Sequence, residues 1–170
     1  ICEGDQGLNP GQEEMSHVTN PEHLHGTLAD ALRGADAFIG VSRPGLVTAE
    51  MVSTMDRGIV FPMANPVPEI WPDEAKRGGA AVVGTGRSDF PNQINNVLVF
   101  PGVFKGALMV RARDITEGMK IRAAKAIAGL IPDDQLSAGC IIPSVLDKTV
   151  ADAVAQAVAQ AARDEGVARS

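Results

Sequence analysis

The sequence predicts an α/β fold, with a partial doubly wound parallel sheet followed by C-terminal helices. Three short apolar runs have the length of buried strands and alternate with segments of helical spacing: residues 37–42, 59–64 and 80–86. Nearly continuous apolar strands that alternate with helices are typical of a parallel sheet covered on both faces. The length of 170 residues suits one domain, and a hydrophobic content of 45% provides for a buried core.

Turn and cap residues mark the junctions in the first half of the chain. A short amphipathic helix is expected within residues 27–36, with Gly34 at its end. Thr48 can cap a second helix, which Gly58 closes. Pro62 lacks the N–H that a central strand would use, so we expect a bulge or an early strand end there. Pro72 suits the first turn of a third helix.

The second half of the chain is expected to be helical. One long helix is predicted over residues 92–112, with a kink at Pro101-Gly102 as an option. Asp114 and Glu117 form a start resembling a capping box for a helix within residues 114–131. An alanine-rich helix with one apolar stripe is predicted over residues 149–163. Residues 1–20, which are polar and broken by Gly and Pro, predict no regular element.

Composition excludes several classes of partner. A net charge of -6 disfavours binding to nucleic acid or to an anionic membrane surface. The sequence shows no apolar stretch long enough to span a bilayer and no signal-peptide pattern. Cys2 and Cys140 lie far apart without CxxC spacing, which indicates a reducing, cytoplasmic location and no zinc knuckle. The chain begins at Ile1 rather than at methionine, so the gene is expected to start further upstream.

Polar residues directly follow each predicted strand. Val41 and Ser42 follow the first strand, Asn65 follows the second, and Asn95 and Asn96 lie in an amide-rich segment after the third. Ligands of open parallel sheets bind beyond the carboxyl ends of the strands, so we expect these residues to share one crevice. Side-chain amides offer a donor and an acceptor without charge. They suit a hydroxyl, a carboxylate oxygen or a nicotinamide carboxamide better than a bare phosphate.

Structural interpretations of the same segment remain open. Asn92 and Asn95 are also suited to cap or flank a helix. Residues 84–89 imitate the dinucleotide fingerprint in two glycines, but Asp89 stands where the third would be, which favours a tight turn over a phosphate loop. Arg87 and Asp89 predict either a local ion pair or a ligand contact.

Two other groups of residues favour a structural interpretation. His17, His23 and His25 lie in an irregular polar segment without Cys or carboxylate ligand spacing, which favours a solvated loop over a metal site. Asp133 and Asp134 follow a predicted helix end and indicate a turn. No metal ligand is therefore assigned in this chain.

Three stretches carry a family resemblance. "TGRSDFPNQINNVLVFPGVFKGAL", with "GADAFIGVSRPG" and "FPMANPVPEI" before it, resembles the NAD(P)-binding domain of malic enzymes, the bacterial type in particular. The resemblance extends from about Leu28 to the C-terminus and is weaker over residues 1–20. It implies that residues 1–170 are the C-terminal part of a Rossmann-like domain. The first βαβ half with its fingerprint loop and the N-terminal catalytic domain are expected to lie outside this chain.

The resemblance also implies an activity and a set of roles. Malic enzymes convert L-malate to pyruvate and CO2 with NAD or NADP and with Mg²⁺ or Mn²⁺. By resemblance, Asn65 lies beside the nicotinamide and the substrate, while Asn95 and Asn96 contact the substrate and the nicotinamide ribose. Val41 and Ser42 would line the cofactor through backbone groups. The resemblance does not decide which of Asn95 and Asn96 holds malate, nor between NAD and NADP.

The resemblance places the catalytic tyrosine and lysine and the metal ligands outside this chain, which contains no tyrosine. No catalytic residue is therefore expected here, and the isolated chain is expected to be inactive. The complete enzyme is expected to be a homodimer or a higher homo-oligomer. Two alternatives remain: a non-catalytic remnant or assembly module, and another NAD(P)-dependent dehydrogenase of a small acid.

Overall fold

The sheet is built from the three predicted apolar runs. The computed structural model describes residues 1–169. Its strands are parallel, in the order β1-β2-β3, and they are β1 (Ala37–Gly40), β2 (Ile59–Pro62) and β3 (Val82–Val83). The register pairs Ala37 with Ile59 and Gly40 with Pro62. The predicted parallel sheet is confirmed, although β3 is shorter than its apolar run. Pro62 ends β2, as its missing N–H predicts.

Short helices accompany the strands: α1 (Pro10–Ser16), α2 (Leu28–Leu32), α3 (Ala49–Ser53) and α4 (Pro72–Arg77). Thr48 caps α3 as predicted, since its Oγ1 accepts from the N–H of Met51 at 3.3 Å. Pro72 occupies the first turn of α4. The sequence analysis missed α1, which begins with a capping box between Asn9 and Gln12.

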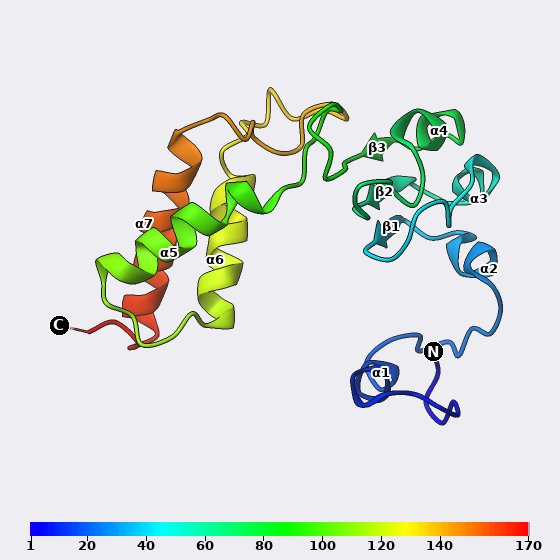
Figure 1. Cartoon of the computed structure of the whole chain (residues 1–170), viewed down its shortest axis with the longest axis horizontal. Helices are drawn as coiled ribbons and strands as arrows, with labels where there is room; N and C mark the ends of the chain where they lie inside the picture. Colours follow the sequence, from blue (N-terminus) through cyan, green and yellow to red (C-terminus); the bar gives the residue numbers. More distant parts are fainter. Residues whose placement is uncertain (170) are drawn as a thin grey trace.

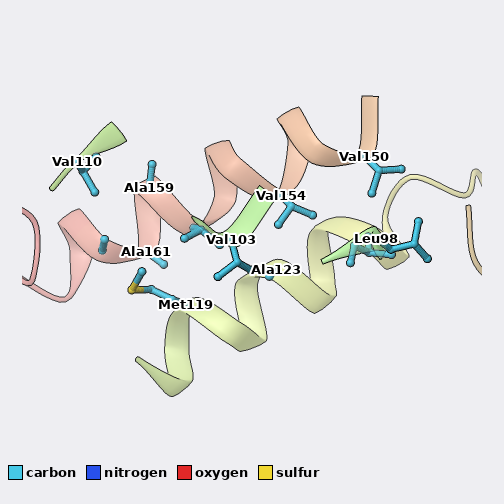
Figure 2. Close-up of a cluster of buried hydrophobic side chains, with 12 residues drawn as sticks. Leu98, Val103, Val110, Met119, Ala123, Val150, Val154, Ala159 and Ala161 are labelled. Atoms are coloured by element: carbon cyan, nitrogen blue, oxygen red, sulfur yellow. The ribbon is translucent and has the colours of Figure 1, made fainter. Parts of the chain in front are cut away.

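The buried hydrophobic residues form two separate clusters, one in the part that contains the sheet and one in the helical bundle (Figure 1). One lies between the sheet and α2–α4 and is formed by Leu32, Val47, Val52, Val60, Ile70, Ala75 and Val83. The other fills the bundle of α5 (Phe100–Met109), α6 (Glu117–Ala128) and α7 (Thr149–Asp164), and Figure 2 shows Leu98, Val103, Met119 and Val154 within it. The carboxyl ends of the strands lie toward residues 84–99, which connect β3 to the helical bundle (Figure 1).

Helix α5 packs directly on the backbone of α7. A Cβ on Gly106 would lie 2.4 Å from the carbonyl oxygen of Ala155, so only glycine permits this approach. The outer face of α5 exposes Phe100, Phe104 and Leu108.

None of the helices formed by residues 1–169 combines the length and the apolar character needed to cross a bilayer.

Two predicted helix starts are wrong. The helix predicted over residues 92–112 is instead a short 3-10 helix, η1 (Asn96–Leu98), followed by α5. Pro101 lies in the first turn of α5, where the N–H that proline lacks has no intrahelical partner, and so it causes no kink. Helix α6 is capped by Thr116, whose Oγ1 accepts from the N–H of Met119 at 3.1 Å. Asp114 instead accepts from the N–H of Ile115.

Candidate functional site

Three asparagines converge at the carboxyl ends of β2 and β3. The amide pocket, as we name it, has a volume of about 290 Å³ and is lined by Met63, Asn65, Gly86, Ile94, Asn95 and Asn96. A second hollow of about 330 Å³ shares Asn65, Gly86 and Asn95 with it and continues over residues 87–89. The expected meeting of Asn65 with Asn95 and Asn96 is therefore found. The ligand contacts assigned to them stay predictions.

The end of β2 is fixed by the segment that follows β3. The buried Thr85 donates its hydroxyl to the carbonyl of Pro62 at 3.1 Å. Beyond it, a Cβ on Gly86 would lie only 3.1 Å from Nδ2 of Asn65. The absence of a side chain at Gly86 thus lets the Asn65 amide lie against the backbone of the neighbouring segment. Asn65 itself remains exposed, with a single hydrogen bond of 3.4 Å to the carbonyl of Met63 among residues 1–169.

Glu69 connects the ends of β1 and β2, and the sequence did not predict this role. Its side chain is fully buried. Oε1 accepts from the N–H of Ser42 at 2.8 Å, and Oε2 accepts from the N–H of Ala64 at 3.0 Å. Because Ala64 directly precedes Asn65, Glu69 sets the position of the backbone that carries this amide. The only sequence signal is that Glu69 is the single charged residue within residues 58–72. 

Val41 and Ser42 lie at the end of β1, but among residues 1–169 neither lines the amide pocket or the hollow beside it. Val41 is exposed, and the backbone N–H of Ser42 is already donated to Glu69. Through Glu69, the Ser42 turn is nevertheless held next to Ala64. The expectation that Val41 and Ser42 share this pocket with the asparagines is therefore wrong, while their contact with a cofactor stays a prediction.

Arg87 and Asp89 form the local ion pair that was one of the two predicted alternatives. Nε and one terminal nitrogen of Arg87 each donate to an oxygen of Asp89 at 2.8 Å. The other terminal nitrogen donates to the carbonyl of Pro66 at 2.9 Å, and the guanidinium lies 5.1 Å from the centre of the Trp71 ring. The hydrogen bonds from Arg87 lower the pKa of Asp89, and the same bonds raise the pKa of Arg87. Arg87 thus braces the loop after Asn65.

The asparagines that follow β3 have two different roles: Asn92 is structural, whereas Asn95 and Asn96 line the amide pocket. Asn92 is buried, and its Nδ2 donates to the carbonyls of Val83 and Ala138, both at 2.9 Å. Its Oδ1 accepts from the N–H of Ile141 at 3.0 Å. Asn92 therefore joins β3 to the connection between α6 and α7, which is a structural role. Its φ of 56° lies in the left-handed region that asparagine tolerates.

Asn95 caps a helix, as one of its two predicted interpretations has it, and it also lines the amide pocket. Its Oδ1 accepts from the N–H of Val97 at 3.0 Å and so caps η1. Its side chain also lines the amide pocket, where Nδ2 is left as a donor. Asn96 is exposed beside it. Within residues 1–169, the lining of the amide pocket contains no titratable side chain, so this pocket can hold a polar ligand but cannot itself move a proton.

Comparisons with known proteins show the family of this chain. The family described as malic enzyme, NAD binding domain, matches residues 6–163. The chain is 56% identical over 171 residues to the bifunctional malic/malolactic enzyme of Bacillus subtilis strain 168, which covers 99% of this chain and 42% of the relative. It is 54% identical over 162 residues to the NAD-dependent malic enzyme of Geobacillus stearothermophilus, which covers 95% of this chain and 34% of that relative.

A solved structure gives the same result. The malic enzyme from Pyrococcus horikoshii Ot3 matches with a TM-score of 0.89 at 49% sequence identity, over 95% of this chain and 37% of that one. The chain thus spans between about a third and about two fifths of the length of these three proteins. The family resemblance predicted from the sequence is confirmed, and the chain belongs to the malic enzyme NAD-binding domain family.

Proposed function

We propose that this chain supplies the nicotinamide side of the active site of a malic enzyme. Together with the rest of such an enzyme, it would convert L-malate to pyruvate and CO2 while NAD⁺ or NADP⁺ is reduced. The observation that carries the proposal is the convergence of Asn65, Asn95 and Asn96 in one pocket at the carboxyl ends of parallel strands. Ligands of such sheets bind at that edge.

The donor set of the amide pocket fits a nicotinamide and a hydroxy acid. The side-chain amide of Asn65 can pair with the nicotinamide carboxamide, because each group has one donor and one acceptor side. The Asn65 amide occupies the space where a side chain at residue 86 would lie, so glycine at this position lets Asn65 take its place in the pocket. Bound NAD(P)⁺ would supply the hydride acceptor, and Asn65 would orient it against the substrate.

Asn95 and Asn96 differ in what they can offer a substrate. Oδ1 of Asn95 is engaged with Val97, so Asn95 can still donate through Nδ2 to a carboxylate or a ribose hydroxyl. Asn96 keeps both its donor and its acceptor, since no hydrogen bond of its side chain occurs among residues 1–169. We assign malate to Asn96 and the ribose to Asn95. Val41 and Ser42 would border the cofactor through their carbonyl groups.

The remaining chemistry is assigned to the part of the enzyme outside this chain. The amide pocket lacks a titratable group, so the general acid, the general base and the ligands of Mg²⁺ or Mn²⁺ would come from elsewhere. The isolated chain, residues 1–170, would then be the C-terminal part of the cofactor domain and inactive alone. As the family resemblance implies, the complete enzyme would be a cytoplasmic homodimer or higher homo-oligomer.

A chimera tests this proposal. This chain replaces the matching segment of the Bacillus subtilis relative, and malate-dependent reduction of NAD⁺ and of NADP⁺ is measured from the absorbance of the reduced cofactor. We expect turnover from the chimera and none from the isolated chain. A folded chimera without turnover, beside an active parent enzyme, would support a non-catalytic module instead. Turnover by the isolated chain would overturn the assignment of proton transfer to other parts.

A further inference from the structure

The N-terminal segment, residues 1–26, is organised without a hydrophobic core. Neither hydrophobic cluster includes a residue before Leu32 among the residues that the structure describes. Figure 1 shows this segment and α1 set apart from the sheet and from the bundle. Helix α1 has only seven residues.

A mixed set of ligand groups joins the two ends of this segment. Cys2 is 4% exposed, and its Sγ lies 3.6 Å from Nε2 of His25. The carboxylate of Asp5 accepts from the backbone N–H of Cys2 at 2.7 Å. One ligand atom from each of Cys2, Asp5 and His25 can be chosen so that all three lie within 4.8 Å of one another. The fold therefore brings a thiol, an imidazole and a carboxylate to one point.

The spacing matches a tetrahedral zinc site. Zinc binds sulfur at about 2.3 Å and imidazole nitrogen at about 2.0–2.1 Å, so two such ligands at a tetrahedral angle are separated by roughly 3.5 Å. The observed separation of Sγ and Nε2 is 3.6 Å. Asp5 is exposed and free to turn its second oxygen toward the same point. Three protein ligands leave the fourth tetrahedral position to a water molecule.

We propose that Cys2, Asp5 and His25 bind one Zn²⁺ ion, which fastens residues 2–5 to residues 20–25. Thiolate and imidazole favour zinc over the hard cations Mg²⁺ and Mn²⁺, so this site is separate from the divalent cation of the proposed reaction. Binding would release the thiol proton of Cys2, because the thiolate is the ligand. The proposal does not depend on the enzymatic role of the chain.

Asn20 supports the site from outside the ligand set. Its Nδ2 lies 3.0 Å from Sγ of Cys2 and 3.1 Å from the carbonyl of Leu24, and its Oδ1 accepts from the N–H of Leu24 at 2.8 Å. It thus holds the sulfur and the loop that leads to His25 in one arrangement. Side chains that orient metal ligands in this way typically change metal affinity by about 10–100-fold when they are removed.

The other two histidines provide matched controls. The sequence analysis favoured a solvated loop for all three, because no Cys or carboxylate lies at ligand spacing along the chain. Chain folding instead places Cys2 and Asp5 beside His25. His17 lies near Glu3, with 3.4 Å between Nδ1 and the carboxylate, and neither His17 nor His23 joins the ligand set among residues 1–169.

Titration of the metal-free chain with Co²⁺ tests the site, because a cobalt thiolate site has a near-ultraviolet charge-transfer band and strong visible bands when tetrahedral. We expect both at one cobalt per chain, and Zn²⁺ should displace the cobalt. The charge-transfer band should vanish in Cys2→Ser, and the tetrahedral bands should weaken in His25→Gln and Asp5→Asn. Asn20→Ala should lower zinc affinity by about 10–100-fold. Circular dichroism checks that each variant is folded.

The controls decide between this site and incidental thiol binding. Cys140→Ser and the double variant His17→Gln/His23→Gln should retain the wild-type spectrum and zinc affinity. Absence of the cobalt bands in the folded wild-type chain would overturn the proposal. A spectrum that survives Cys2→Ser but is lost in Cys140→Ser would do so as well. Unchanged zinc affinity in both His25→Gln and Asp5→Asn would reduce the site to a single thiol and equally contradict it.

Discussion

The side chain of Glu69 fills the space in which residue 40 would carry a side chain. A Cβ on Gly40 would lie 2.5 Å from Cδ of Glu69, closer than any real contact of this kind. Because position 40 is glycine, Glu69 can reach the backbone N–H groups of both Ser42 and Ala64. A single buried side chain thereby sets the ends of β1 and β2, from which the amide pocket is built.

A side chain at residue 40 should destabilise the fold through this contact. We expect Gly40→Ala to lower the free energy of unfolding by about 1–3 kcal/mol, because it overpacks a filled space. In a Glu69→Ala background the same substitution should cost less, since the Glu69 atoms are gone and only Cε1 of Phe38, at 2.8 Å, still lies too close to the added Cβ. Urea denaturation of the two single variants and the double variant measures this coupling. Strictly additive losses would show that the two residues do not interact in this way.

Removal of the Glu69 side chain should leave two backbone donors without their acceptor. We expect Glu69→Ala to lower the free energy of unfolding by about 2–4 kcal/mol, since each unsatisfied buried donor costs about 1–3 kcal/mol. Glu69→Gln keeps one acceptor oxygen and should lose less. Chemical denaturation checks the order of the three proteins. If Glu69→Gln proved as unstable as Glu69→Ala, the two-acceptor account would be wrong.

Substitution of Asn92 should destabilise the fold, whereas substitution of Asn96 should leave its stability nearly unchanged. Asn92→Gly tolerates the positive φ but loses three hydrogen bonds, so we expect a loss of about 2–4 kcal/mol in the free energy of unfolding. Asn96→Ala, at an exposed position, should change it by less than about 0.5 kcal/mol. Thermal and urea unfolding of both variants test this contrast. Equal losses would contradict the division between a structural and a pocket amide.

The link between Arg87 and Asp89 should weaken in acid. The pKa of Asp89 in the folded chain lies below its ordinary value of 3.8, because Arg87 donates to its carboxylate. The pair therefore adds stability at pH values above this ordinary pKa and loses it as the pH falls through the lower, folded value. Any difference in stability between wild type and Asp89→Asn at neutral pH should shrink below about pH 4. A difference that grew in acid would reverse the assigned sign.

The strands were predictable because their signals are local. The predicted closure of α3 by Gly58 is wrong, because α3 already ends at Ser53. Pro62 nevertheless ends β2, and Thr48 and Pro72 begin the helices on either side of it. Each of these residues acts through its own backbone or its immediate neighbours. The predicted helix over residues 92–112 was wrong because apolar spacing does not distinguish a 3-10 turn capped by Asn95 from a helical turn.

The site was predictable only in part, for a related reason. The rule that ligands bind at strand ends was enough to bring Asn65, Asn95 and Asn96 together. Glu69 reaches Ser42 across 27 residues, and Cys2 reaches His25 across 23. No spacing rule along the chain anticipates contacts of that range, since they depend on how the loops close after the strands form.

The central claim is that Asn65 acts at the reacting end of the bound cofactor. Steady-state kinetics of the chimera with Asn65→Ala test it most directly, with Gln156→Ala on the exposed face of α7 as the matched amide control. We predict that Asn65→Ala lowers kcat by about 100- to 1000-fold, as is typical when a positioned hydrogen bond at a reacting centre is lost, while Gln156→Ala keeps the parent constants. A folded Asn65→Ala chimera with the kcat and KM of the parent chimera would contradict the account.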